Sequence, residues 1–241
     1  MKKLMYLLLL LPFTILAQEN DSYILSMSEI TVKQGHNDAF VQGVKAWKEC
    51  YTENEGENQW NVWHRMQGEG NVYVLTSAMA NWAEFDDESA DTAGKNCRNI
   101  VLNLIMPHIE STKYNVSRSI PDWSSSMPED TGLVWVTFFE VQNYTAFRNT
   151  VNAIRDALKQ SNDERPGIWY ASMGGDRHSA DYFVSNPFSK FADLDKEVDG
   201  IWKVYENIHG KKKTDELRST FRNSVVDIWS YIYTLKKELS N

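Results

Sequence analysis

An internal repeat of apolar residues restricts the fold of this chain more than any other feature. Four residues with the spacing i, i+4, i+7 and i+11 occur twice, 107 residues apart: Phe40, Val44, Trp47 and Tyr51, then Phe147, Val151, Ile154 and Leu158. This spacing is typical of one face of a helix. Downstream the offset becomes 106, and it pairs Trp63 with Trp169, Trp82 with Phe188, Phe85 with Phe191, and Gly94 with Gly200. The repeat predicts two copies of one folding unit in tandem.

Each copy is expected to run strand, helix, strand, strand, helix, strand. The elements expected in the first copy are 23–32, 37–51, 60–66, 71–77, 87–108 and 114–120, and those in the second are 133–141, 144–160, 168–173, 181–184, 191–223 and 225–235. The two long helical regions are expected to break near Gly94 and Gly200. Glycines between the paired strands permit the positive φ angles of hairpin turns. This order is that of the ferredoxin-like β-α-β-β-α-β unit.

A ferredoxin-like unit carries its helices on one face of the sheet, so the other face must be covered. We therefore expect an α+β fold of two tandem ferredoxin-like units, with their sheets packed face to face as an intrachain α/β barrel. The first unit is expected over residues 18–120 and the second over 131–241. Residues 121–130, which are rich in Ser, Pro and acidic residues, are expected to form the linker.

The first 17 residues have the pattern of a secretory signal peptide. Lys2 and Lys3 precede an apolar run that ends at Leu16, and polar residues follow Ala17. Cleavage is therefore expected after Ala17, which would release the rest of the chain into an extracytoplasmic space, periplasmic or secreted. Ile15 is larger than the usual residue at its position, so an uncleaved membrane anchor stays open as the alternative.

The charge balance disfavours nucleic acid as a partner. The chain has 25 Lys and Arg against 33 Asp and Glu, a formal net charge of −8. An acidic surface repels phosphate backbones. The only basic run, residues 211–213, is expected to lie in a solvated loop or at the start of a helix. We expect a monomer with an internal pseudo-dimer, or a homodimer, and no membrane association after signal cleavage.

The only cysteines are Cys50 and Cys97. Cys50 lies at the end of the first expected helix and Cys97 lies early in the second. The two helices of a ferredoxin-like unit run antiparallel on one face, so these two positions should be close together. In an oxidising compartment this predicts a structural disulfide.

Several short segments resemble the dimeric α/β-barrel superfamily, which includes antibiotic-biosynthesis-monooxygenase-like and NIPSNAP-like proteins. They are Val32-Lys33-Gln34-Gly35 before the first helix, the tryptophan-bearing hairpin, and Trp82-Ala83-Glu84-Phe85 before the second helix. The resemblance covers essentially all of residues 22–236. It implies a barrel built from two units and an activity that ranges from cofactor-free oxygenation of phenols to haem degradation, isomerisation or plain ligand binding. No catalytic motif of the superfamily transfers residue by residue.

The candidate catalytic residues lie on the strand after Trp60. Side chains alternate along a strand, so His64 shares a face with Trp60 and Val62, and Arg65 lies on the other. In a cavity between the sheets, His64 could act as a general base, Arg65 could hold an anionic oxygen, and Tyr170, the expected counterpart of His64, could donate a hydrogen bond. The competing interpretation is that His64 is a hydrogen-bonded sheet residue and Arg65 a surface cation.

Three further residues are candidate ligand contacts. Trp63 and Trp169 could stack on a ligand, although their recurrence in both copies favours a role in the core. His108 could face the cavity, although a histidine at a helix end commonly interacts with the helix dipole. No histidine and cysteine spacing predicts a metal site.

The segment 195–206 is similar to a calcium-binding loop. Glu197 and Lys203 occupy positions where that loop needs a small acidic or amide residue and a neutral or negative one. The matching stretch of the first copy keeps the glycine with one acidic ligand position. We therefore interpret Gly200 as a helix break and expect neither a metal nor a cofactor.

The leading functional interpretation is an exported protein that binds a small aromatic or apolar molecule between its two sheets. The first alternative is a cofactor-free monooxygenase or isomerase that uses His64, Arg65 and Tyr170. The second is a non-catalytic structural or interaction protein whose barrel is filled by its own side chains, which the many aromatic residues favour.

Overall fold

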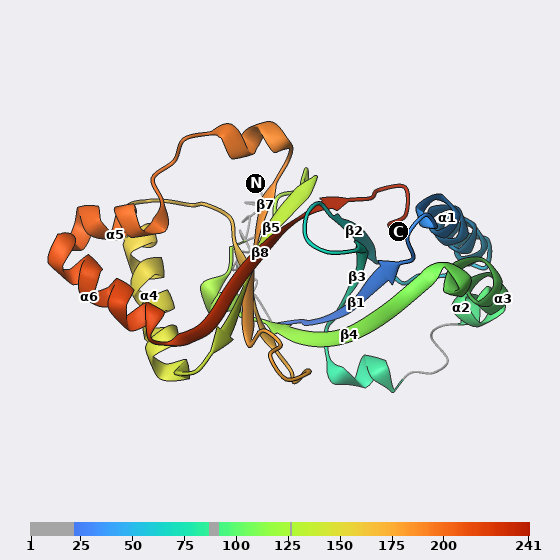
Figure 1. Ribbon diagram of the computed structural model, residues 1–241, viewed down its shortest axis with the longest axis horizontal. Helices are drawn as coiled ribbons and strands as arrows, with labels where there is room; N and C mark the ends of the chain where they lie inside the picture. Colours follow the sequence, from blue (N-terminus) through green and yellow to red (C-terminus); the bar gives the residue numbers. More distant parts are fainter. Residues whose placement is uncertain (1–21, 87–91, 126) are drawn as a thin grey trace, which may run out of the picture.

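A closed antiparallel barrel of eight strands forms the centre of the protein (Figure 1). This computed structural model describes residues 22–86, 92–125 and 127–241, so the expected signal peptide, 1–17, lies outside the described residues. The strands are β1 (Ile24–Val32), β2 (Asn61–Arg65), β3 (Asn71–Met79), β4 (Ile109–Ser119), β5 (Leu133–Val141), β6 (Ile168–Ser172), β7 (Tyr182–Phe188) and β8 (Val225–Leu235). The α-helices are α1 (Asn37–Glu53), α2 (Thr92–Asn96), α3 (Arg98–Ile100), α4 (Tyr144–Gln160), α5 (Ile201–His209) and α6 (Lys211–Arg222).

The strands follow one another around the barrel in the order β1-β3-β2-β8-β5-β7-β6-β4. Every neighbouring pair is antiparallel. The first half of the chain supplies the run β4-β1-β3-β2 and the second half supplies β6-β7-β5-β8. The two runs are hydrogen-bonded to each other twice, where β2 meets β8 and where β4 meets β6.

This architecture corrects the expected one. The prediction of two ferredoxin-like units with sheets packed face to face is wrong, because the strands form one continuous ring instead of two stacked sheets. An open sheet leaves unpaired N–H and C=O groups along its edge strands. Edge-to-edge pairing satisfies these groups and curls both runs around a shared interior, which face-to-face packing would not do.

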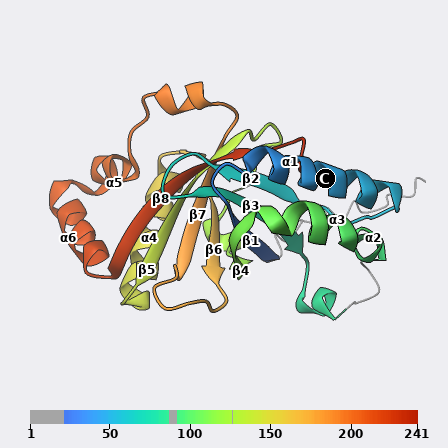
Figure 2. The ribbon, with the colours of Figure 1, turned by 45° about the vertical axis from the view of Figure 1, so that its right-hand side comes forward.

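Helices cover the outside of the barrel at its two opposite ends. Figures 1 and 2 show α1, α2 and α3 on one side and α4, α5 and α6 on the other, with the strands between them. The outer face of the first run packs on α1 and on the π-helical segment Val101–Ile105. The outer face of the second run packs on α4 and α6.

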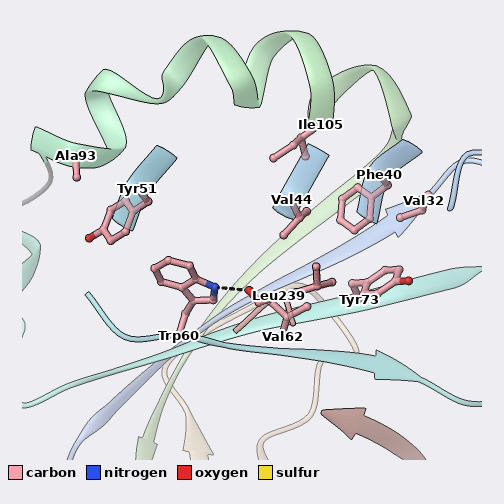
Figure 3. Packing of buried hydrophobic residues seen from close by; sticks show 10 residues of the cluster. All are labelled: Val32, Phe40, Val44, Tyr51, Trp60, Val62, Tyr73, Ala93, Ile105 and Leu239. Carbon is pink, nitrogen blue, oxygen red and sulfur yellow. Dashed lines mark hydrogen bonds between the residues drawn. The ribbon is translucent and has the colours of Figure 1, made fainter. Parts of the chain in front are cut away.

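The aromatic residues of the first repeat unit lie in the layer between helix and barrel (Figure 3). Trp60 contacts Trp47 and Tyr51 of α1, with ring centroids 4.8 and 5.2 Å apart. The Trp60 indole Nε1 donates a hydrogen bond of 2.9 Å to the carbonyl of Leu239, which is fully buried. The end of the chain is therefore held against the first half of the protein.

The expected elements agree closely with the observed ones where the apolar periodicity is strong. The bounds of β5, α4 and β8 are those expected, and β1 differs by one residue. The second long helical region breaks at Gly200 as expected, and it breaks again at Gly210, which has a φ of 81°. The expected start of the other long helix, 87–91, lies outside the described residues.

The segment expected to be a linker contributes to the core. Trp123 is 5% exposed and packs against Trp169 and Phe147. Its indole Nε1 donates a hydrogen bond of 2.8 Å to the side chain of Asn152 in α4. Within the described ranges, no helix is long and apolar enough to cross a membrane.

The expected disulfide between Cys50 and Cys97 is present. It joins the last turn of α1 to the end of α2, and the Asn54 side chain lies beside both sulfur atoms. The two cysteines are separated by 47 residues in sequence. The bond therefore closes a long loop of the unfolded chain.

Removal of this disulfide should destabilise the protein without changing its fold. The double variant Cys50→Ala/Cys97→Ala is expected to lose about 3–4 kcal/mol of unfolding free energy, because the unfolded chain regains the entropy of the closed loop. Urea unfolding measures the loss. The wild-type protein in a reducing agent serves as the control and should unfold at the same urea concentration as the variant. An unchanged midpoint would contradict a stabilising role for the bond.

Candidate functional site: a cavity inside the barrel

The interior of the barrel contains a cavity of about 500 Å³. Its wall is mostly apolar and comes from both halves of the chain, with Leu25 and Val74 from the first and Val136 and Phe183 from the second. A volume of this size matches that of pockets for small organic molecules. The protein's aromatic residues therefore do not fill the barrel completely.

Strand β1 lines one side of the cavity with alternate side chains. Tyr23 precedes the strand, and Leu25, Met27 and Glu29 follow on the same face. Successive side chains of a strand point to opposite faces, so only every second residue reaches the interior. This row has a polar residue at each end and two apolar residues between them.

A pair of tyrosine hydroxyls forms the polar group at one end of the row. The Tyr23 and Tyr170 hydroxyl oxygens are 2.6 Å apart, and their rings meet edge to face. The Tyr170 ring stacks on Phe183 with a centroid distance of 4.7 Å. The backbone of Tyr23 is held by Ser119, whose hydroxyl accepts a hydrogen bond of 2.9 Å from the Tyr23 amide. The two hydroxyls are therefore held rigidly by β4, β6 and β7.

Burial keeps both hydroxyls in the neutral form. Desolvation raises the pKa of Tyr170, and the neighbouring Tyr23 hydroxyl raises it further. Desolvation also raises the pKa of Tyr23, an effect that the hydrogen bond to Tyr170 partly offsets. One hydroxyl donates to the other, so the accepting hydroxyl keeps its own proton free for a ligand. The pair can thus donate a hydrogen bond to an oxygen in the cavity.

Glu29 provides the polar group at the other end of the row. Among the described residues that line the cavity, it is the only one with a formally charged side chain. It lies close enough to Tyr233 to affect that residue, since burial and then the Glu29 carboxylate raise the pKa of Tyr233. The cavity therefore has a hydroxyl pair and a carboxylate at separate positions.

His64, the expected general base, does not line the cavity. Its Nε2 lies 2.7 Å from the Asn71 Oδ1, and its ring stacks on Tyr73 at 4.6 Å. Tyr73 in turn packs on Phe40 of α1. His64 thus belongs to the outer face of β2, as do Trp60 and Val62, whose side chains pack toward the helices. The barrel wall separates it from Tyr170.

Arg65 lies on the opposite face of β2 from His64 and beyond the cavity lining. Its guanidinium group is 4.6 Å from the centroid of the Tyr231 ring and donates a hydrogen bond to the carbonyl of Glu69. Both interactions hold the side chain near the turn after β2. The structure therefore does not bring His64, Arg65 and Tyr170 together, and only Tyr170 lines the cavity.

The two tryptophans that the sequence paired lie on opposite faces of the barrel wall. Trp63 lines the cavity, and its Nε1 donates a hydrogen bond of 3.1 Å to the Thr76 hydroxyl. Trp169 faces outward and stacks on Phe139 at 5.5 Å. The offset of 106 is therefore one residue short at this strand. With the offset of 107 seen in the helices, Trp63 corresponds to Tyr170, and both residues face the interior.

His108 and the segment 195–206 lie away from the cavity. The Nδ1 atoms of His108 and His36 are 2.8 Å apart, at the junction of β1 and α1. In the segment, Glu206 pairs with Lys203 and Asp199 accepts a hydrogen bond from Asn207. Across the part of the chain that the structure describes, no group of three or more His, Cys, Asp or Glu residues could hold a metal ion.

Tyr23 and Glu29 are site residues that the sequence reasoning missed. The alternation of Tyr23, Leu25, Met27 and Glu29 is visible in the sequence and predicts that they share one face. What was missing is which face of the strand meets the interior. The described lining also contains neither histidine nor cysteine, two common protein ligands of haem iron, so it does not fit a haem held in either way.

No protein-family model and no curated protein sequence matches the chain. A solved structure of a protein from Lactobacillus acidophilus NCFM, proposed to be a monooxygenase, is similar with a TM-score of 0.52 and 10% identity, over 91% of this chain and 98% of that one. A second protein proposed to be a monooxygenase, from Fusobacterium nucleatum, has a TM-score of 0.51 and 12% identity, over 90% and 94% of the chains. The chain therefore has the fold of the dimeric α/β-barrel superfamily, to which these structures belong. At such low identity the similarity concerns the fold alone.

The buried tyrosine pair should make the stability of the protein decrease in alkaline solution. Above about pH 10, tyrosines of the unfolded chain release their protons while Tyr170 retains its own, so unfolding becomes more favourable as the pH rises toward the raised pKa. Tyr170→Phe is expected to make this decrease shallower. At neutral pH the same variant should lose about 1 kcal/mol, since it leaves the Tyr23 hydroxyl without its partner.

Urea unfolding at a series of pH values from neutral to about 11 measures this effect. Tyr114→Phe is the matched control, because Tyr114 is 78% exposed and its hydroxyl is in water before and after unfolding. Equal alkaline slopes for the wild type and Tyr170→Phe would contradict the assignment.

Proposed function

We propose that this protein is a cofactor-free monooxygenase whose substrate is a mostly apolar organic molecule bound in the barrel cavity. The observation that carries the proposal is the pair of Tyr23 and Tyr170 hydroxyls at the wall of an otherwise largely apolar cavity of about 500 Å³. The shared fold with two proteins proposed to be monooxygenases supports it.

The tyrosine pair suits a substrate that reacts through an oxygen-centred anion. A phenol or an enol that loses a proton places negative charge on its oxygen, and fixed hydrogen-bond donors at that oxygen stabilise the anion. Because burial raises the pKa of Tyr170, its hydroxyl stays protonated and can remain a donor. The apolar wall excludes water, which protects the electron-rich intermediate from side reactions.

The reaction balances with dioxygen as the only co-reactant. The substrate anion transfers electrons to O₂, and a carbon–oxygen bond forms at the activated carbon. A CH₂ group next to the aromatic system becomes a C=O group, and the second oxygen atom leaves as water with the two hydrogen atoms of that carbon. The protein's residues bind the substrate oxygen and exclude water.

Plain binding without chemistry is the second candidate. The cavity would serve a carrier equally well, and the absence of histidine from its described lining favours this role. Binding without oxygen consumption would identify a carrier. We further infer that the protein acts outside the cytoplasm, which the signal-like first 17 residues and the Cys50–Cys97 disulfide support. The recurring order of strands and helices in the two halves supports a tandem duplication.

Anthrone is a suitable probe substrate, because its central CH₂ group is acidic and its oxidation by one O₂ gives anthraquinone and water. The wild-type protein is expected to accelerate oxygen uptake with anthrone, measured with an oxygen electrode alongside anthraquinone absorbance. Val74→Phe should reduce that rate at least tenfold, because Val74 lines the cavity and a larger side chain would occupy the binding space.

Leu75→Phe is the matched control. It makes a similar enlargement on the same strand, but Leu75 packs against the helix layer and not in the cavity. It should alter stability and leave oxygen uptake close to the wild-type rate. Anthrone oxidation no faster than in buffer, or equal rates for wild type and Val74→Phe, would contradict the proposed site for this substrate class.

A further inference from the structure

We infer that the ligand of the barrel cavity carries a positively charged end, which Glu29 binds. This inference rests on the proposal that the cavity holds an organic ligand and adds the chemical class of that ligand. It concerns the end of the cavity that the tyrosine pair does not reach.

Glu29 and the tyrosine pair are too far apart to bind the same substituent. Tyr23 and Glu29 are six residues apart along one extended stretch of chain. A strand rises about 3.3 Å per residue, so the two positions are separated by about 20 Å. Glu29 therefore has a role other than holding the reacting oxygen.

The carboxylate of Glu29 has no partner among the described residues. No hydrogen bond or ion pair within the described ranges involves it, and the five ion pairs found there lie elsewhere. Its neighbour across the β1–β4 pairing is Lys113, whose side chain is exposed and forms no ion pair with it. Arg65, the other nearby cation, is engaged by Glu69 and Tyr231.

A carboxylate in a largely apolar cavity favours a cationic partner. Partial removal from water costs free energy that a bound positive charge offsets. An ammonium group suits the position best, because it donates charge-assisted hydrogen bonds to the carboxylate and is attracted to aromatic faces. Such faces are at hand, since Trp63 lines the same cavity and Tyr233 lies near Glu29.

The row of side chains on β1 also indicates the shape of the ligand. Leu25 and Met27 separate the hydroxyl pair from the carboxylate, so an elongated molecule with an apolar middle fits the row. Its oxygen function would lie at Tyr23 and Tyr170 and its cationic end at Glu29. A mostly apolar amine is the ligand class that this arrangement selects.

Dodecylamine, 1-dodecanol and dodecanoic acid are matched probes, because they share one chain and differ in the charge of the head group. Isothermal titration calorimetry with each compound, below the concentration at which it aggregates, measures affinity for the full-length protein. The amine is expected to bind about tenfold more tightly than the alcohol, as one charge-assisted hydrogen bond would provide. The acid should bind more weakly than the alcohol, because two carboxylates would repel each other.

Glu29→Gln keeps the shape of the side chain and removes its charge. It is expected to abolish the preference for the amine while leaving the affinity for the alcohol unchanged. Glu110→Gln is the control, since it removes one negative charge from an exposed position of β4 outside the cavity lining. It should retain the full preference, which separates a local contact from general attraction to an acidic protein.

The outcomes distinguish this inference from the proposed function. Equal binding of the amine and the alcohol, or a preference that survives in Glu29→Gln, would overturn the inference and leave the cavity as a binding site for neutral molecules. Failure of all three probes to bind, together with no anthrone oxidation, would overturn the proposed function as well.

Discussion

The pairing of β2 with β8 and of β4 with β6 is the interaction on which the rest of the structure depends. At each seam three residue pairs are in register, from Trp63 with Leu235 to Arg65 with Tyr233 and from Ser117 with Ser172 to Ser119 with Tyr170. Further backbone hydrogen bonds extend both seams, including those from Met66 to Ile232 and from Met173 to Val116, each 2.8 Å long. Without these seams the two runs of strands would be open sheets with unpaired edges, and the cavity would have no closed wall.

Closure of the barrel also explains where each kind of side chain lies. The outward faces of the strands are covered by helices and take the dense aromatic packing, such as Trp60 against α1 and Trp169 beside α4. The inward faces meet across the ring and leave room for a ligand. The Tyr23–Tyr170 pair joins residues 147 positions apart in sequence and lies beside the seam between β4 and β6. Half of the candidate site is therefore built by contacts between the two halves of the chain.

The cavity differs from the catalytic group that the sequence alone suggested. A histidine beside an arginine on a strand is a reasonable candidate for acid–base chemistry, yet His64 is engaged by Asn71 and Tyr73 in the helix layer. The groups that do line the cavity are two tyrosine hydroxyls and one carboxylate. Such a set is suited to holding an oxygen at one place and a cation at another, which is why the proposed chemistry relies on stabilising an anion and not on a histidine base.

The sequence by itself determined the secondary structure and the disulfide. Periodic apolar residues define α4 and β8 because local spacing decides which face of an element is buried. Cys50 and Cys97 could be paired because both lie at helix ends that the expected fold brings together. Only the tertiary structure decided that the strands close into one ring and which face of each strand is inside. That decision depends on the register between strands distant in sequence, where a shift of one residue moves a side chain to the other face, as Trp63 and Trp169 demonstrate.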